Sequence, residues 1–134
     1  MYAFDLCSQY QQAINSGDLE RVLALFEPDA TVTTPVAGTM HVADYHRQLF
    51  SYARKATVRV RNLLEGLSGA PSVGLYLDHV LELHDGGSIA FTGINLYELT
   101  PDRLRIARLT IIYDSAPIRA RLERLMRPHS ALAS

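Results

Sequence analysis

Hydrophobic residues recur with helical spacing in three stretches of the first part of the chain. The first stretch spans residues 3–15, where apolar side chains lie four positions apart, as on one face of a helix. Gly17 ends this helix, and Asp18 is a good N-cap for a second helix that ends at Pro28. A third amphipathic helix is predicted over residues 42–54. The apolar faces of these helices need a common partner.

Strand-like patterns dominate the rest of the chain. A short β-rich run at 30–34 is followed by a loop at 36–39, and longer strand patterns cover 57–67 and 104–113. A short helix is predicted over 118–127. Helices that precede a run of antiparallel strands are typical of the α+β class. We therefore expect a single domain over the whole chain, in which three helices pack on a curved, mostly antiparallel sheet around a conical cavity.

The longest strand pattern is a predicted hairpin. Two alternating runs, 73–83 and 89–99, flank Gly86 and Gly87. A Gly-Gly pair between alternating runs indicates a two-residue turn, because both glycines can adopt positive φ. This turn fixes which residues face each other across the hairpin, and hence which residues share a face.

In that register Asp78 lies opposite Asn95. The same face of the hairpin carries Tyr76, Glu82, Phe91 and Tyr97. The other face is aliphatic, with Leu77, Leu81, Leu83, Ile94 and Leu96. An apolar patch of this size is unfavourable when it is exposed to water. We therefore expect a second copy of the chain to cover it in an isologous homodimer. His79 falls on this aliphatic face and is interpreted as an interface histidine.

Composition narrows the classes of function. The 134 residues carry a formal net charge of -1, which gives no electrostatic footprint for nucleic acid. We find no signal peptide and no apolar run long enough for a membrane span, so no membrane partner is expected. The lone Cys7 suits a small core residue in a reducing cytoplasm, and no Cys/His spacing typical of a metal site occurs. We expect neither a metal nor a cofactor.

The segment Tyr10–Thr34, YQQAINSGDLERVLALFEPDATVTT, resembles the opening of the nuclear transport factor 2-like (SnoaL-like) superfamily. The helix, the Asn-Ser-Gly-Asp break, the Leu-Phe helix end and the Pro-Asp-Ala turn carry the resemblance, and the later strand pattern extends it over nearly the whole chain. The resemblance implies a cone-shaped α+β barrel. It implies little about function, since this fold hosts isomerases, epoxide hydrolases, cyclases, dehydratases and binding domains.

Within the superfamily the opening is most similar to steroid Δ-isomerases. These enzymes use an aspartate base and an oxyanion hole formed by a tyrosine and a protonated aspartate. The resemblance places Tyr10 on the oxyanion-hole tyrosine and Asn95 on the protonated aspartate. Thr34 falls on the general base, and a threonine cannot do that work near neutral pH. Because Asp78 shares a face with Asn95 in the predicted hairpin, our hypothesis is that Asp78 supplies the missing carboxylate.

Each of these residues can instead have a purely structural role. Asp78 can be a structural acid, and Tyr10 a core tyrosine with a satisfied hydroxyl. His46 follows Tyr45 on the third helix and is interpreted as a surface histidine, with the cavity mouth as the alternative. The residues expected to line the pocket are Thr34, Tyr76, Glu82, Phe91, Tyr97, Leu109, Ile111 and Tyr113.

The sequence leaves three functions open. The first is a cofactor-independent acid–base enzyme of the isomerase, cyclase or hydratase type, acting on a hydrophobic carbonyl compound or a polyketide- or steroid-like metabolite with Asp78, Tyr10 and Asn95. The second is a non-catalytic binding domain for an apolar metabolite. The third is an association domain that dimerises through its sheet.

Overall fold

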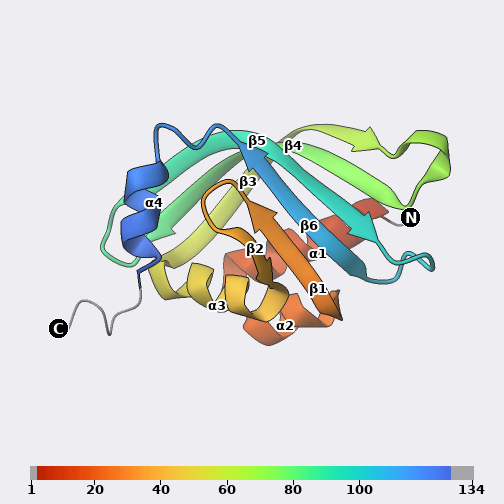
Figure 1. Cartoon of the computed structure of the whole chain (residues 1–134), viewed down its shortest axis with the longest axis horizontal. Coiled ribbons are helices and arrows are strands. Elements are labelled where there is room, and N and C mark those ends of the chain that lie inside the picture. Colours follow the sequence, from red (N-terminus) through yellow and green to blue (C-terminus); the bar gives the residue numbers. More distant parts are fainter. Residues whose placement is uncertain (1–2, 128–134) are drawn as a thin grey trace.

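The computed structural model describes residues 3–127, in which four α-helices and a 3-10 turn accompany a six-stranded sheet (Figure 1). In chain order the elements are α1 (Ala3–Ser16), α2 (Leu19–Ala24), β1 (Phe26–Thr34), β2 (Gly38–His41), α3 (Val42–Tyr52), β3 (Ala53–Glu65), η1 (Leu67–Gly69), β4 (Ser72–Leu83), β5 (Ser88–Leu99), β6 (Ile106–Tyr113) and α4 (Arg119–Leu125).

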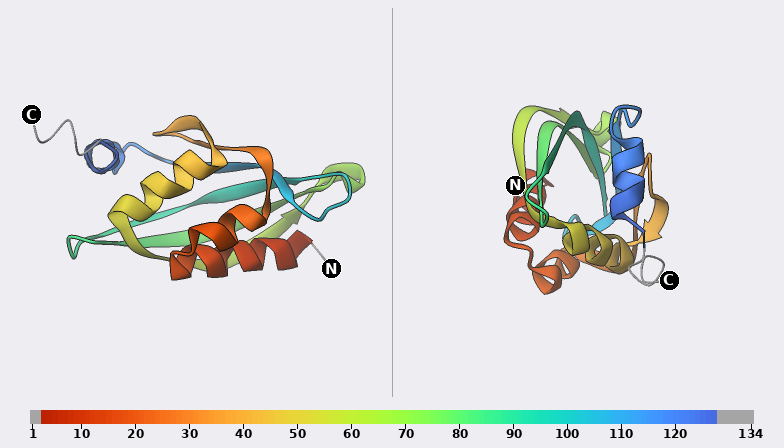
Figure 2. Two further views of the ribbon diagram at one scale, coloured as in Figure 1. Left: turned by 90° about the horizontal axis from the view of Figure 1, so that it is seen from below. Right: turned by 90° about the vertical axis from the view of Figure 1, so that its left-hand side faces the viewer.

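The strand order in the sheet is β2-β1-β6-β5-β4-β3. The β1–β6 pair is parallel and the other neighbouring pairs are antiparallel. The sheet is curved and not closed, and it arches over α1, α2 and α3, which lie together on its inner side (Figure 2). The predicted α+β architecture, with helices on the inside of a curved sheet, is confirmed.

The N-terminal helices follow the predicted pattern, with one difference at the second helix. Asp18 caps α2 by accepting a hydrogen bond from the backbone N–H of Arg21 at 3.1 Å. The helix ends at Ala24, so the expectation that it continues to Pro28 is wrong. Phe26 instead begins β1 beside Ile106, whose N–H donates to the Leu25 carbonyl at 2.8 Å. The expected loop at 36–39 is also different, since Gly38 begins the short strand β2.

The β4–β5 hairpin forms as predicted, but its register differs. The last strand pair is Glu82 with Ser88, and the N–H of Leu83 donates to the Gly87 carbonyl at 2.8 Å. Gly86 has a φ of 93°, whereas Gly87 is outside the positive-φ region. A two-residue turn with positive φ at both glycines is therefore absent, and the connection is longer.

The longer connection changes which residues share a face. Asn95 lies opposite Leu75, and Asp78 lies opposite Thr92. Because side chains alternate along a strand, the shift by an odd number of residues turns every side chain of β4 to the opposite face relative to β5. Burial explains the outcome: the observed register places the odd-numbered leucines of β4 in the core, where Leu75, Leu77, Leu81 and Leu83 are buried.

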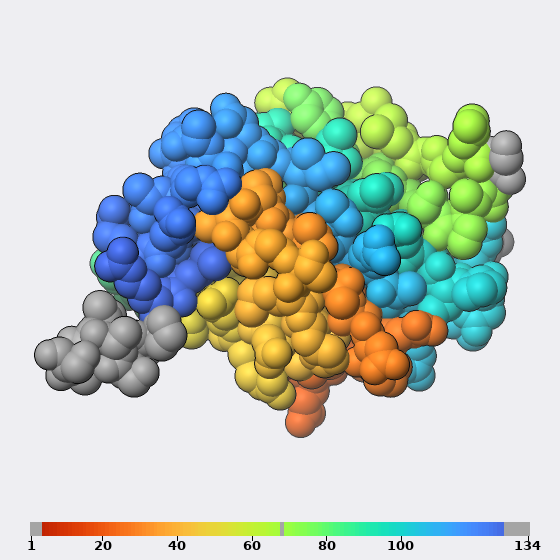
Figure 3. Space-filling model, viewed as in Figure 1, coloured from red at the N-terminus to blue at the C-terminus, as the bar shows by residue number. Residues whose placement is uncertain are grey.

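The core lies between the inner face of the sheet and the three N-terminal helices. The largest fully buried side chains are Tyr97, Phe26, Leu75, Leu77, Leu83, Ile106, Leu109 and His46. The fourth helix, α4, covers the end of the molecule that carries the β4–β5 turn, and it lies against the turn between β1 and β2 (Figure 3). Arg119 and Arg121 hold α4 there by donating to the carbonyls of Pro35 at 3.1 Å and Ser88 at 2.7 Å.

Candidate functional site

A cavity of about 60 Å³ lies between the sheet and the helices. Its wall is built from α1, α3, α4, the β1–β2 turn and strands β3 to β6. The described residues that line it are apolar, aromatic or neutral polar, and none of them is an Asp, Glu, Lys or Arg. A charged ligand would lose its hydration in this cavity without gaining an opposite charge.

Six of the residues expected at the site lie in this wall. They are Tyr10, Thr34, Phe91, Asn95, Ile111 and Tyr113. Thr34 uses its hydroxyl oxygen to accept a hydrogen bond from the N–H of Ala37 at 3.0 Å, which shapes the β1–β2 turn. Tyr97 and Leu109 are fully buried in the core behind the wall.

Tyr76 and Glu82 lie outside the cavity, contrary to the expectation. Both alternate with the buried leucines of β4 and therefore point to the outer face of the sheet. Glu82 pairs with Arg54 at 2.8 Å, and Tyr76 packs beside Arg61, whose guanidinium carbon lies 5.4 Å from the ring centroid.

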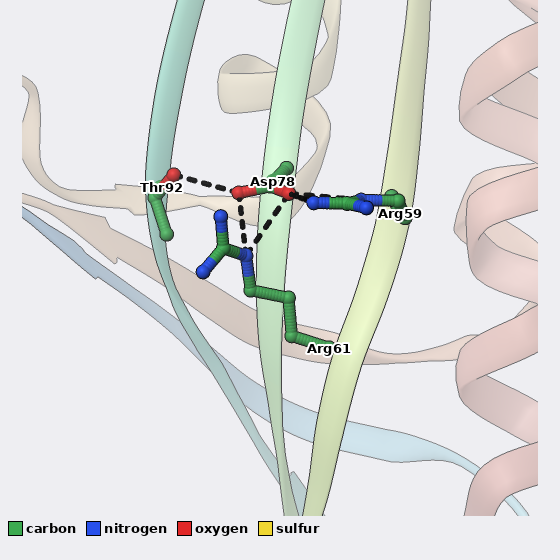
Figure 4. A network of polar contacts seen from close by, with 4 residues as sticks. All are labelled: Arg59, Arg61, Asp78 and Thr92. Atoms are coloured by element: carbon green, nitrogen blue, oxygen red, sulfur yellow. Dashed lines mark hydrogen bonds and ion pairs between the residues drawn. The ribbon is translucent and has the colours of Figure 1, made fainter.

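The expectation that Asp78 faces the cavity is also wrong. Asp78 lies on the outer face, where it pairs with Arg59 at 2.7 Å and with Arg61 at 2.9 Å, and it accepts the Thr92 hydroxyl at 2.7 Å (Figure 4). Hydrogen bonds from Arg61, Thr92 and Arg59 hold the pKa of the Asp78 carboxyl well below its usual range. The predicted register assigned the side chains of β4 to the wrong faces of the sheet. Asp78, which forms ion pairs on the outer face, was therefore expected in the cavity.

Tyr10 and His46 form a buried pair. The Tyr10 hydroxyl and His46 Nε2 are 2.8 Å apart, and His46 Nδ1 lies 2.8 Å from the Val42 carbonyl oxygen. Because a carbonyl can only accept, Nδ1 carries the proton, and the Tyr10 hydroxyl donates to Nε2. The side chain of His46 is 0% exposed, so its interpretation as a surface histidine is wrong. Burial lowers the pKa of His46 to about 4, and the pair is neutral at pH 7.

Asn95 is buried beside Tyr97. Its Nδ2 donates to the Tyr97 hydroxyl at 3.1 Å, and Gln11 donates to the same hydroxyl at 3.0 Å. The other polar atom of this side chain, Asn95 Oδ1, is buried in the cavity wall without a hydrogen-bond partner. A buried acceptor of this kind is costly and needs an explanation.

His79 occupies the wall next to Asn95. It is 8% exposed, and its Nε2 is the second buried side-chain atom without a hydrogen-bond partner among the described residues. Its ring is stacked on Phe91, with the centroids 4.5 Å apart and 14° between the planes. Burial lowers the pKa of His79 to about 4, against smaller raising effects of a polar contact with Asn95 and of the Asp78 charge. The contact with Asn95 lacks hydrogen-bond geometry, so it leaves His79 Nε2 and Asn95 Oδ1 without a partner. The interpretation of His79 as an interface histidine is wrong, because β4 presents it to the cavity.

Three tyrosines line the cavity: Tyr45 and Tyr52 from α3, and Tyr113 from β6. Burial is the main cause that raises the pKa of Tyr45, Tyr52 and Tyr113, and the charge of one phenolate would oppose that of another. Leu122 and Met126 cover the same region, and Gln48 donates to the Met126 carbonyl at 3.2 Å. The phenols therefore stay protonated near neutral pH and offer hydroxyl groups rather than charges.

Other candidate chemistry does not gather at this site. Within residues 3–127 no group of three or more His, Cys, Asp or Glu side chains is placed to hold a metal ion. Cys7 is buried, and burial raises the pKa of its thiol to about 12, so it is no nucleophile at neutral pH. None of the helices in the described range has the length and apolar character needed to cross a membrane.

The outer face of the sheet is less apolar than expected. Leu77, Leu81 and Leu83, which were assigned to this face, are buried in the core. The outer surface carries half-buried Ile94 and Leu96, more exposed Tyr76, Val80 and Ile112, and the ion pairs of Asp78. A homodimer through this face stays a prediction.

Comparison with known proteins identifies the fold. No family model matches the sequence, and no curated protein matches it either. An NTF2-like protein of unknown function from Cytophaga hutchinsonii has 18% identity and a TM-score of 0.68, over 88% of this chain and 95% of the other. SalBIII, an epoxide hydrolase/cyclase-like enzyme with a role in pyran ring formation in the polyether salinomycin, has 16% identity and a TM-score of 0.71, over 84% and 90%.

A third similar structure is a hypothetical protein with a ketosteroid isomerase-like fold from Catenulispora acidiphila, in complex with trimethylamine. It has 12% identity and a TM-score of 0.69, over 82% of this chain and 85% of the other. Identities this low support a conclusion about architecture, and the three structures agree on it. This chain has the NTF2-like fold, which it shares with similar structures described as SnoaL-like and ketosteroid isomerase-like.

Proposed function

We propose that this protein binds an apolar small molecule in the cavity and acts on it by cofactor-independent acid–base chemistry. The observation that carries the proposal is the pair of buried, unpartnered polar atoms, His79 Nε2 and Asn95 Oδ1, in an otherwise apolar and aromatic wall. An apolar pocket with a few convergent polar groups is the usual form of a small-molecule site.

The available groups favour proton transfer. A neutral imidazole has a proton on one ring nitrogen and none on the other, so Nε2 can donate a proton to a ligand oxygen or, in the other tautomer, accept one. His79 is neutral at pH 7 and takes the role that we had assigned to Asp78. Asn95 is a neutral hydrogen-bonding group, but its free atom, Oδ1, is an acceptor, whereas the protonated aspartate of the steroid-isomerase pattern is a donor. Isomerisation and cyclisation are the reaction types that such a site supports without a cofactor.

Tyr10 contributes differently from the oxyanion-hole tyrosine that it resembles. Its hydroxyl proton already engages His46 Nε2, so it does not point an unused donor at a ligand. For Tyr10 to act in catalysis, its hydroxyl would have to break the hydrogen bond to His46 and donate to the ligand instead. We assign Tyr10 to positioning the wall around the ligand.

A second candidate function is binding without turnover. It is favoured by the lack of any carboxylate among the described lining residues, since a carboxylate is the general base of the steroid isomerases. Substrate consumption separates the two functions. We expect a compound that stabilises the protein to be converted to an isomer in the first case and recovered unchanged in the second.

A ligand-stabilisation screen tests the shared part of both functions. Steroid-, polyketide- and terpenoid-like compounds are added to the wild-type protein, to Leu81→Phe, which fills the cavity, and to Val80→Phe, the neighbouring position on the outer face. We expect stabilising compounds to act on the wild type and on Val80→Phe but much less on Leu81→Phe. Equal stabilisation of all three proteins, or none by any compound, contradicts the proposed function.

A further inference from the structure

We propose that the cavity takes an uncharged, hydroxyl-bearing apolar molecule whose hydroxyl group lies between His79 Nε2 and Asn95 Oδ1. This inference rests on the proposed function and names the class of ligand. Neither of the two polar atoms has a protein partner, both residues are more than nine-tenths buried, and both line the same cavity.

Charge excludes the ionic ligands. The described residues of the wall carry no charged side chain, and His46 and His79 are neutral at pH 7 because burial lowers the pKa of each to about 4. Asp78, the acidic residue next to His79 in the sequence, points to the other face of the sheet and is paired with two arginines. A carboxylate or an ammonium group would therefore be buried without a counter-charge.

Hydrogen-bond capacity selects the hydroxyl group among neutral ligands. Asn95 uses its Nδ2 on Tyr97, so the unpartnered Oδ1 needs a donor. One hydroxyl proton cannot serve two acceptors, so we assign the proton of the neutral His79 ring to Nε2, which then donates to the hydroxyl oxygen while the hydroxyl proton goes to Asn95 Oδ1. A ketone or an ether has no proton to give to Asn95 Oδ1. An alcohol, enol or phenol can satisfy both atoms at once.

The aromatic side chains next to this polar pair suit a flat ligand body. Phe91 is stacked on His79 on one side, and on the other its centroid lies 4.4 Å from that of Tyr113. Val58 and Leu81 complete the apolar surroundings. Together the wall offers a layer of rings beside the point where the hydroxyl group would bind.

Phenol and toluene are matched probes, because they have the same shape and differ by a hydroxyl in place of a methyl group. Their dissociation constants are measured by NMR titration for the wild type, for His79→Phe and for Asn95→Leu, with benzoate as the charged probe. His84→Gln is the control, since His84 is exposed and binds the Phe50 carbonyl outside the cavity. Each cavity variant removes an unpartnered polar atom. Asn95→Leu also removes the Nδ2 hydrogen bond to the Tyr97 hydroxyl, which keeps Gln11 as a donor, so we expect both variants to fold.

For the wild type and His84→Gln we expect phenol to bind more tightly than toluene, although toluene is the more hydrophobic molecule. The ratio should fall about tenfold in His79→Phe and in Asn95→Leu, the factor that one hydrogen bond of about 1.4 kcal/mol provides. Benzoate should bind more weakly than either probe. An unchanged ratio in both cavity variants, or benzoate binding as tight as phenol, overturns this inference and leaves the proposed pocket intact. No binding of either neutral probe overturns both.

Discussion

His79 of β4 lies directly opposite Phe91 of β5, and the two rings are stacked with their centroids 4.5 Å apart. This pairing places a histidine on the inner face of the sheet, where the predicted hairpin had an aspartate. It also fixes the protonation of the site. Because His79 is buried in apolar surroundings, it is neutral where an exposed histidine would begin to take up a proton.

The two buried histidines make the stability of the protein depend on pH. The pKa of His46 and that of His79 are each lowered to about 4 in the folded state, against about 6.5 for an unfolded chain. Between pH values of about 4 and 6.5 the unfolded state binds more protons than the folded state. The free energy of unfolding therefore rises with pH across this range, and the same amount of stability is lost when the pH is lowered through it. Each histidine contributes up to roughly 3 kcal/mol.

This dependence is measured by comparing the midpoints of urea unfolding at about pH 5 and about pH 7.5. We expect the wild-type midpoint to fall on acidification and the fall to be about half as large in His79→Phe. His84→Gln, at an exposed position, should behave as the wild type. A pH dependence that His79→Phe leaves unchanged contradicts the neutral, buried His79.

Asp78→Asn should weaken the protein without affecting the cavity. The substitution removes the charge that pairs with Arg59 and Arg61 on the outer face. Those partners depress the pKa of Asp78, so its contribution is present above the ordinary carboxyl range near pH ~3.9 and is lost as the pH falls below it. We therefore expect a lower melting temperature than the wild type at pH 7, a smaller difference at pH 3, and unchanged phenol binding. A loss of phenol binding would return Asp78 to the site.

Tyr10→Phe should destabilise the fold through His46. Without the Tyr10 hydroxyl, His46 Nε2 becomes a buried acceptor without a partner, at a cost of about 1–3 kcal/mol. The double variant Tyr10→Phe/His46→Leu removes both polar groups. Its loss of unfolding free energy should be smaller than the sum of the two single losses. Additive losses in this double-mutant cycle would show that the two residues do not act as a pair.

The outer face of the sheet gives a separate prediction about assembly. Ile112 is 51% exposed beside Ile94, and a second copy of the sheet would cover both. Sedimentation velocity should find a dimer for the wild type and a monomer for Ile112→Glu. Leu104→Glu, at a 72% exposed position in the β5–β6 connection, should stay dimeric. A monomeric wild type contradicts the dimer.

The sequence predicts the class of fold because helical and alternating patterns are local properties. The stripe that contains Leu6 and Tyr10 and the cap at Asp18 depend on neighbouring residues, and the structure agrees with them. The hairpin register is different, since it depends on how the chain closes the turn around Gly86. When the predicted pairing of β4 with β5 is wrong by an odd number of residues, every side chain of β4 is assigned to the opposite face of the sheet. This error moved Asp78 into the predicted cavity and His79 out of it, and the better indicator was the buried row of odd-numbered leucines.

His46 was missed for another reason. Its position beside Tyr45 on α3 predicts little by itself, because neighbouring helix residues point in different directions. Its burial follows from the contacts with Tyr10 and Phe26, which come from distant parts of the chain. Tertiary contacts of this kind leave no signal in a single sequence.

The central claim is that the inner face of the β4–β5 hairpin is the ligand site. The most direct test follows the imidazole resonances of the histidines in nitrogen-15 NMR spectra while phenol is added. We predict a saturable change at His79, together with changes at the backbone amides of Phe91 and Asn95, while His84 and the outer-face residue Thr92 stay unchanged. Saturable changes at Thr92 and Ile112 without any change at His79 would contradict the account.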